Sequence, residues 1–217
     1  MSIEADFYNT NAKFKSLEIE NQDGYMKGYL YKIIWQSAVL SGAEIGQEGA
    51  KTLFETGYTS SANRLSDYEM LYGLFGAYKA ASEFAKTNKV LTFNDINGFW
   101  LLCTRYLDCG RENECLKTKE LSDFCEQMNI KCQNVQDMQP WEKYMLTFEA
   151  YFDIFELLPW NVANYRMARL MSHFFQLRFS LFPTNFLGLP LDIERLSEMH
   201  IKGLNAEITE FLKKIGD

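Results

Sequence analysis

Apolar residues recur at intervals of three and four along most of the chain, which is the period of an amphipathic helix. In residues 141–157 the apolar stripe consists of Trp141, Tyr144, Met145, Phe148, Tyr151, Phe152 and Phe155. Residues 166–182 repeat the pattern through Met167, Leu170, Met171, Phe174 and Leu177. Pro159 and Pro183 follow the two stretches. Because proline lacks an N–H and clashes with the preceding turn, the pattern predicts two helices joined by a short loop.

Other stretches with the same period predict further helices. They are residues 30–40, 46–56 (closed by Gly57), 64–85, 92–107, 116–128 and 191–215, the last with a break considered at Gly203. The helix from residue 64 carries the stripe Leu65, Tyr68, Leu71, Tyr72, Phe75 and Tyr78. The helix from residue 92 carries Ile96, Phe99, Trp100 and Cys103, and Thr92 and Asp95 are spaced as a capping pair.

Strand signals are few. The best position for a β-hairpin is 106–114, where Gly110 and Asn113 permit a turn. The sequence therefore predicts a mostly helical, all-α domain with at most one short β-hairpin.

Composition narrows the functional classes. The 217 residues are 47% apolar and 15% aromatic, which is typical of a packed globular protein, and the formal charge is −7. That charge argues against nucleic acid as a partner, because nucleic-acid binding requires a basic face. No run of 18 apolar residues indicates a membrane span, and the polar N-terminus lacks a secretory pattern. We expect a cytoplasmic protein whose partner is another protein, with a homo-oligomer also considered.

Five cysteines, at 103, 109, 115, 125 and 132, contain no CxxC pair, and the chain has only two histidines. A zinc site would be hard to assemble from this set, so we expect reduced structural or surface thiols.

The loop between the two helices carries the candidate chemistry. We expect Asn161 or Asn164 to cap the second helix, whose first amides and positive dipole end then face outward. Arg166 and Arg169 are three residues apart on one side of that helix. Amides, dipole and guanidinium groups together predict a phosphate cradle. The alternative is that these arginines face water or pair with carboxylates.

The loop resembles a known motif. Residues 158–169, LPWNVANYRMAR, are similar to HPFx(D/E)GNGRxxR of the Fic/Doc (Fido) family, and keep its proline, an aromatic residue, the asparagine and both arginines. Residues 35–57 resemble the family segment that reads SxxIEGN followed by a short helix. The resemblance implies a Fic/Doc-like domain at 30–217, with 1–29 as an N-terminal extension packing on it.

The family transfers an adenylyl group, usually from ATP with Mg²⁺, to a hydroxyl on a target protein. The motif histidine is the general base, the acidic residue holds the metal, and the asparagine and arginines contribute to phosphate binding. Here Leu158 occupies the histidine position and Val162 the acidic position, while Ala163 and Tyr165 replace the glycines. The resemblance leaves Asn164, Arg166 and Arg169 as phosphate or nucleotide ligands, and no catalytic or metal-binding residue. Loss of a general base costs about 10²–10⁴-fold in rate.

The family's inhibitory motif is also altered. Its counterpart here is Ser37, Ser41 and Gly42, with Ser41 at the position of the inhibitory glutamate, which in the family pairs with the second motif arginine.

Four residues could in principle replace the missing base: Asp153, Glu156, His173 and His200. We expect His173 to be a satisfied or surface histidine and His200 to pack in the closing helix. We interpret Asp153 and Glu156 as residues on a solvated face of their helix.

Three functional hypotheses result. The first is a catalytically inactive Fic-fold protein that acts as a binding or regulatory module with residual phosphate or nucleotide affinity. The second is a nucleotidyl (AMP) transferase with a non-standard mechanism, for which ATP and Mg²⁺ would be the cofactors. The third is an unrelated helical interaction domain.

Overall fold

The computed structural model describes residues 3–59, 63–87, 89–106, 114–184 and 193–216, except for the side chains of residues 193–202. The helices are α1 (Ile3–Ser16), α2 (Ile19–Val39), α3 (Gln47–Thr56), α4 (Leu65–Ala85), α5 (Phe93–Thr104), α6 (Thr118–Gln133), α7 (Pro140–Leu157), α8 (Asn164–Arg178) and α9 (Ile193–Gly216). A short 3₁₀ helix, Val135–Asp137, precedes α7. The prediction of an all-α domain is confirmed. The predicted hairpin at 106–114 falls almost entirely outside the described residues.

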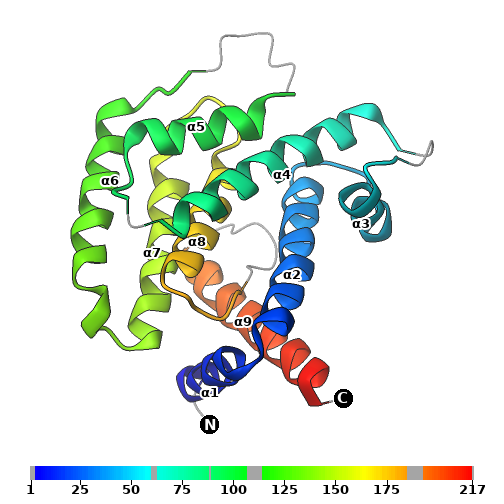
Figure 1. The fold of residues 1–217 in the computed structure, drawn as a ribbon. Helices are drawn as coiled ribbons and strands as arrows, with labels where there is room; N and C mark the ends of the chain where they lie inside the picture. Colours follow the sequence, from blue (N-terminus) through cyan, green and yellow to red (C-terminus); the bar gives the residue numbers. More distant parts are fainter. Residues whose placement is uncertain (1–2, 60–62, 88, 107–113, 185–192, 217) are drawn as a thin grey trace.

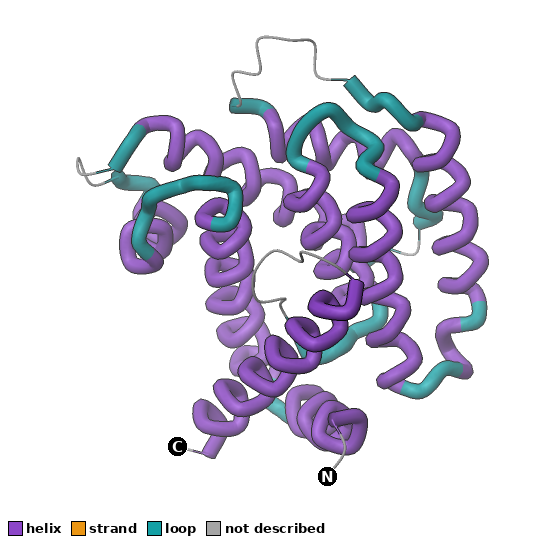
Figure 2. The backbone as a smooth tube through the Cα atoms, turned by 180° about the vertical axis from the view of Figure 1, so that it is seen from behind, coloured by secondary structure: helices purple, strands orange, loops and turns teal. Residues whose placement is uncertain are grey.

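Helix α8 lies at the centre of the molecule (Figures 1 and 2). All residues from Arg166 to Gln176 are buried, and the neighbours of α8 are α7, α4 and α5. Helix α7 runs back along α8, and α2 and α4 meet beside them (Figure 1). A helix enclosed in this way needs apolar residues around most of its circumference, so its few polar residues must find partners inside the protein.

Local signals in the sequence fix several helix ends. Thr92 and Asp95 form the predicted capping box at the start of α5. Gly57 closes α3 in the left-handed conformation, with φ of 74°, as expected for a helix-terminating glycine. Of the two possibilities considered for the closing stretch, the structure has the single helix: α9 continues through Gly203, because the helical ladder tolerates one interior glycine at a modest cost.

The N-terminal region is continuous with the domain. The predicted boundary between residues 29 and 30 falls inside α2. Before it, α1 packs on α7, where the ring of Phe7 lies 4.6 Å from that of Tyr144. Asn11 accepts a hydrogen bond of 2.8 Å from the N–H of Phe182.

Part of the predicted apolar stripes faces solvent. Leu65 and Tyr72 of α4 and Met145 of α7 are exposed. In α7, Ala150 and Ile154, which were not part of the predicted stripe, are buried. Residues at spacing 3 and 4 outline a broad face, and only the position of the neighbouring helices decides which edge of that face is covered.

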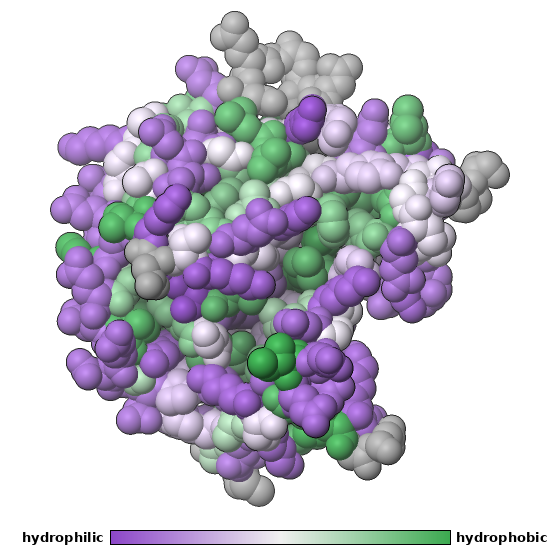
Figure 3. Space-filling model, viewed as in Figure 1, coloured by the Kyte–Doolittle hydropathy of each residue, from purple (hydrophilic) through white to green (hydrophobic). Residues whose placement is uncertain are grey.

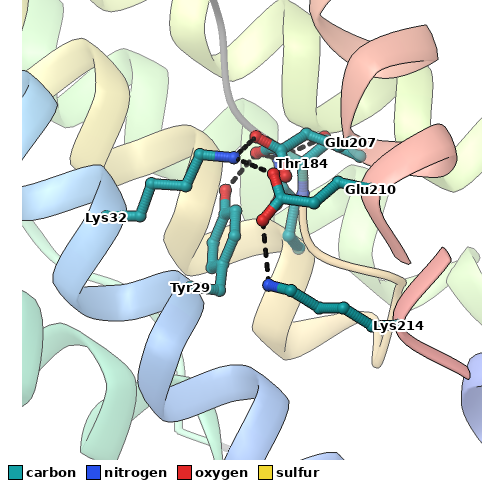
Figure 4. A network of polar contacts seen from close by, with 7 residues as sticks. Tyr29, Lys32, Thr184, Glu207, Glu210 and Lys214 are labelled. Carbon is teal, nitrogen blue, oxygen red and sulfur yellow. Dashed lines mark hydrogen bonds and ion pairs between the residues drawn. The ribbon is translucent and has the colours of Figure 1, made fainter. Parts of the chain in front are cut away.

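A polar network joins α2 to α9 (Figure 4). The ammonium group of Lys32 lies 2.8 Å from the carboxylate of Glu207 and 2.6 Å from that of Glu210, which also binds Lys214 at 2.8 Å. The network lines a cavity of about 340 Å³ that also reaches α3. The surface is hollowed between α3 and the C-terminal end of α9 (Figure 3). Of the helices in the described part of the chain, none is long and apolar enough to cross a membrane.

Candidate functional site

The end of α7 sets the start of the loop. Leu158 closes the helix in the left-handed conformation, with φ of 46° and ψ of 58°, and its N–H donates to the carbonyl of Ile154 at 3.2 Å. Lys117 donates to the last helical carbonyl, that of Leu157, at 2.6 Å. Pro159 then turns the chain, and its carbonyl accepts from the N–H of Leu116 at 2.7 Å. The adjacent residues Leu116 and Lys117, from one segment distant in sequence, therefore hold this loop in place.

Asn164 closes the loop from the other side. Its side-chain oxygen accepts from the N–H of Trp160 at 3.0 Å, and its amide donates to the carbonyl of Trp160 at 2.7 Å. The residue that precedes α8 as its cap is Ala163, with φ of 63° and no side-chain hydrogen bond. The prediction that Asn161 or Asn164 caps this helix is therefore wrong, since Ala163 holds the cap position and the Asn164 amide pairs with the loop backbone.

Tryptophans anchor the middle of the loop. The buried ring of Trp160 stacks on Trp100 of α5, with centroids 5.8 Å apart and planes at 12°. Trp100 donates through Nε1 to the carbonyl of Val162 at 3.0 Å, and Trp160 donates to Asn97 at 3.2 Å. The apolar pattern of the sequence predicted only a core position for Trp100, in the stripe of the helix that begins after residue 92. An indole that must find an acceptor when buried is the signal that could have located this contact.

Arg166 points into the protein toward the end of α2. Only 9% of its surface is exposed. Its Nε donates to the hydroxyl of Ser41 at 2.8 Å, and that hydroxyl donates to the carbonyl of Ser37 at 2.7 Å. Its buried Nη1 has no hydrogen-bond partner among the described residues. Cys103 lies beside the guanidinium group, and burial raises the pKa of its thiol to about 11 although Arg166 opposes the shift.

Arg169 is buried one turn further along α8, with 3% of its surface exposed. Burial lowers its pKa, and the hydroxyls of Tyr151 and Tyr78 beside it oppose that shift. Tyr78 in turn lies 3.5 Å from the hydroxyl of Ser37. The alternative that the two arginines face water is therefore wrong.

The end of α2 brings the inhibitory-motif counterpart to α8. Ser37 and Ser41 reach the region of the two arginines, and Gly42 ends the turn with φ of 96°. The residues that the sequence grouped by resemblance are thus close in space.

The structure describes the side chains of three of the four candidate bases, and none of the three replaces the missing histidine at Leu158. His173 is buried, packs on Tyr29 and Tyr78, and contacts Ser82 through Nε2 at 3.5 Å. Burial lowers the pKa of His173 to about 3, so the imidazole is neutral and is not a surface group. Asp153 is half-buried, where burial raises the pKa of its carboxyl, and Glu156 is exposed. The side chain of His200 lies outside the described residues.

The loop does not fit a magnesium–nucleotide complex. Val162 contributes no side-chain oxygen, and the described residues contain no cluster of three or more histidine, cysteine or carboxylate side chains. Four cavities of about 340–480 Å³ are lined by described residues, and none of these four is lined by Asn164, Arg166 or Arg169. Cysteines 103, 115, 125 and 132 are free thiols, and Cys109 lies outside the described residues.

Comparison with solved structures relates this geometry to known proteins. Fic-1 from C. elegans (residues 134–508) superposes with a TM-score of 0.77 at 14% identity, over 97% of this chain and 70% of that one. A Fic domain containing signaling protein from Bacteroides thetaiotaomicron gives a TM-score of 0.68 at 16% identity, over 99% of this chain and 92% of that one. The chain has the Fic fold. Neither a family model nor a curated protein sequence matches it.

The helices of this chain are therefore arranged as in the Fic fold and not in an unrelated arrangement. The identity to these structures is 14% and 16%. Fold likeness at this identity carries no chemistry with it, because the function depends on the residues in the site.

Proposed function

We propose that this Fic-fold protein is a catalytically inactive binding or regulatory module that retains weak affinity for phosphate groups at the start of α8. The observation that carries the proposal is the pair of buried arginines of α8 beside a loop whose side chains cannot perform the transfer. Ala163, at one of the motif's glycine positions, holds a left-handed conformation that L-residues adopt at a cost, and Leu158 holds another at the end of α7.

The chemistry of the loop supports inactivity. Nucleophilic attack by a target hydroxyl needs a proton acceptor within hydrogen-bonding reach, and Leu158 has none. His173 is buried in the core with a pKa of about 3, so it is both too weak a base and too far inside the helix bundle to replace it. Without a carboxylate at Val162 the loop also lacks a metal ligand.

The guanidinium group of Arg166 supports residual anion affinity. Its Nη1 is buried at the N-terminal end of α8, where the helix dipole also favours negative charge, and no residue in the described part of the chain forms a hydrogen bond with it. An anionic oxygen is the partner that satisfies a buried charged donor best. Because the site is nearly closed, we expect binding in about the millimolar range, near −4 kcal/mol.

Calorimetric titration tests this proposal. ATP and inorganic phosphate should both bind weakly, adenosine should not bind, and Mg²⁺ should leave the affinity for ATP unchanged. The variant Arg166→Ala, Arg169→Ala should lose the heat signal, and Arg105→Ala, which removes an exposed arginine beside α5, should retain it. Tight binding that requires Mg²⁺ would contradict the proposal.

Incubation with labelled ATP and protein extracts tests inactivity directly. We expect no label on any protein. Label transfer that disappears in the Arg166→Ala variant would establish the second hypothesis, a nucleotidyl transferase with a non-standard mechanism.

A further inference from the structure

Three exposed apolar side chains gather around the Pro159 loop. Leu116 is 62% exposed, Leu158 43% and Tyr165 46%. The hydrogen bond from the N–H of Leu116 to the carbonyl of Pro159 brings the first two to the same place. The ring of Tyr165 lies 5.1 Å from that of Phe155, which is one turn before Leu158. We refer to Leu116, Leu158 and Tyr165 as the apolar rim.

The burial of apolar surface during folding does not explain the apolar rim, because its three side chains remain exposed. Single exposed apolar residues are common, but exposed apolar side chains that gather from two regions distant in sequence point to an interaction site. Leu158 also stands at a left-handed position, where glycine or asparagine is the favoured residue. Leu158 therefore places an apolar side chain at a position where the backbone conformation favours another residue type.

A groove lined by acidic side chains lies beside the apolar rim. A cavity of about 450 Å³ lies between α6 and α7, and its walls include Lys117 and Leu157, the chain neighbours of Leu116 and Leu158. Its carboxylates are Glu120, Asp123, Asp153 and Glu156. Lys117 is the one cation in that lining, and its ammonium group is bound to the carbonyl of Leu157. We refer to this cavity as the acidic groove.

The negative charge of the acidic groove is only partly offset within the described part of the chain, by Lys117 in its lining and by Lys131 near Asp153. None of its four carboxylates forms an ion pair with another described residue. Asp153 is half-buried, and burial, together with the nearby charge of Glu149, raises the pKa of its carboxyl. Lysine or arginine side chains placed there would gain charge-assisted hydrogen bonds in a partly desolvated site.

We propose that the apolar rim and the acidic groove form one docking surface for a basic amphipathic segment of a partner protein. Apolar side chains of that segment cover Leu116, Leu158 and Tyr165, and its lysine or arginine side chains enter the groove between α6 and α7. A segment with helical spacing of its apolar residues meets both requirements, because its basic face then lies beside its apolar face. Nucleic acids and anionic lipid surfaces are repelled by the same charge.

Fluorescence anisotropy with labelled peptides tests the docking surface. The probe is a helical peptide of about 18 residues, with leucine at positions i, i+3, i+4 and i+7 and lysine elsewhere. A leucine–glutamate peptide of the same pattern and a lysine–glutamine peptide without leucine serve as comparison probes. We expect the leucine–lysine peptide alone to bind, and to bind more weakly at high salt.

Matched variants separate this surface from the general acidity of the chain. Asp153→Asn with Glu156→Gln should weaken peptide binding about tenfold, and Leu116→Ser with Tyr165→Ser by a similar factor. Glu48→Gln with Glu55→Gln on α3 makes the same charge change, and Val90→Ser removes another exposed apolar side chain. These controls should bind as the unaltered protein does. Equal weakening by the control variants, or no peptide binding, would overturn the proposal.

Sedimentation velocity checks for a second copy of the chain as the occupant. A dimer that dissociates when Leu116 and Tyr165 are replaced by serine would assign the surface to self-association and would overturn the proposed partner. The inference rests on the proposed binding role, but its readout is separate. Peptide binding does not involve nucleotide, so its failure and the failure of phosphate binding can be distinguished.

Discussion

Individual residues of this protein depart from what their positions favour. Leu158 and Ala163 are L-residues in left-handed backbone conformations. His173 is a titratable side chain enclosed in the core. Arg166 is a nearly buried cation with an unsatisfied nitrogen. Each carries a free-energy cost that the surrounding fold must offset, and each cost can be measured.

Replacing Ala163 by glycine should stabilise the protein. Glycine adopts φ near 63° without the clash of a Cβ, which outweighs its larger unfolded-state entropy by about 0.5–1 kcal/mol. Urea denaturation measures the change. Ala206→Gly is the matched control, because Ala206 is exposed inside α9, and there the same substitution should destabilise by about 1 kcal/mol. Destabilisation by both would contradict the strain at Ala163.

His173 should make the protein sensitive to acid. Burial lowers its folded-state pKa to about 3 from an unfolded value of 6.5. Between these values only the unfolded state binds the proton, so stability is full above pH 6.5 and falls with pH by about 1.4 kcal/mol per unit. His173→Phe keeps the aromatic packing on Tyr29 and Tyr78 and should remove this part of the slope. Urea denaturation at pH 7.5, 6 and 4.5 compares the two proteins. An unchanged slope would mean that His173 is protonated in the folded state.

At the scale of the elements, close contact between helices depends on particular small residues. Helix α4 crosses α5 at Gly73, where a Cβ would lie 2.9 Å from the carbonyl oxygen of Cys103. A backbone atom cannot rotate away from that contact as a side chain could, so the two helices would have to separate.

Gly73→Ala should therefore destabilise the protein by about 1–3 kcal/mol. Gly76→Ala, one turn further along the same helix, places its Cβ in open space and should be neutral or stabilise by up to about 1 kcal/mol. Thermal and urea denaturation of the two variants measure the difference. Equal effects would contradict the close approach of α4 and α5 at Gly73.

At the scale of the whole molecule, polar contacts between residues distant in sequence join α2 to α9. Lys32 in α2 binds Glu207 and Glu210 in α9, more than 170 positions later. Glu207 is almost fully buried, and burial raises the pKa of its carboxyl although Lys32 opposes the shift. Removal of Lys32 would leave that carboxylate without its cation.

Lys32→Met should destabilise the protein by about 2 kcal/mol or more at pH 7.5, because breaking a largely buried pair leaves an uncompensated charge. The loss should shrink at mildly acidic pH, because burial raises the pKa of Glu207 and protonation removes that charge. Lys27→Met, an exposed lysine in the same helix, is the control and should change stability by less than about 0.5 kcal/mol. Denaturation at pH 7.5 and at mildly acidic pH checks both statements. A loss independent of pH would show that packing of the Lys32 stem, and not its charge, holds α9.

The sequence by itself determined the helical class, most helix positions and several ends. Periodicity reports which residues share a face, and caps such as Thr92 with Asp95 act over one turn, so both are readable from neighbouring positions. Resemblance of the loop to a short motif also anticipated the Fic fold, which the solved structures support.

Only the tertiary structure decided which edges of the helices are covered and how the loop residues are used. The Asn164 amide closes the loop, Arg166 turns inward to Ser41, and His173 is enclosed between tyrosines from α2 and α4. These outcomes depend on partners that are distant in sequence. No local pattern records such partners, because burial and hydrogen bonding are settled when the helices pack.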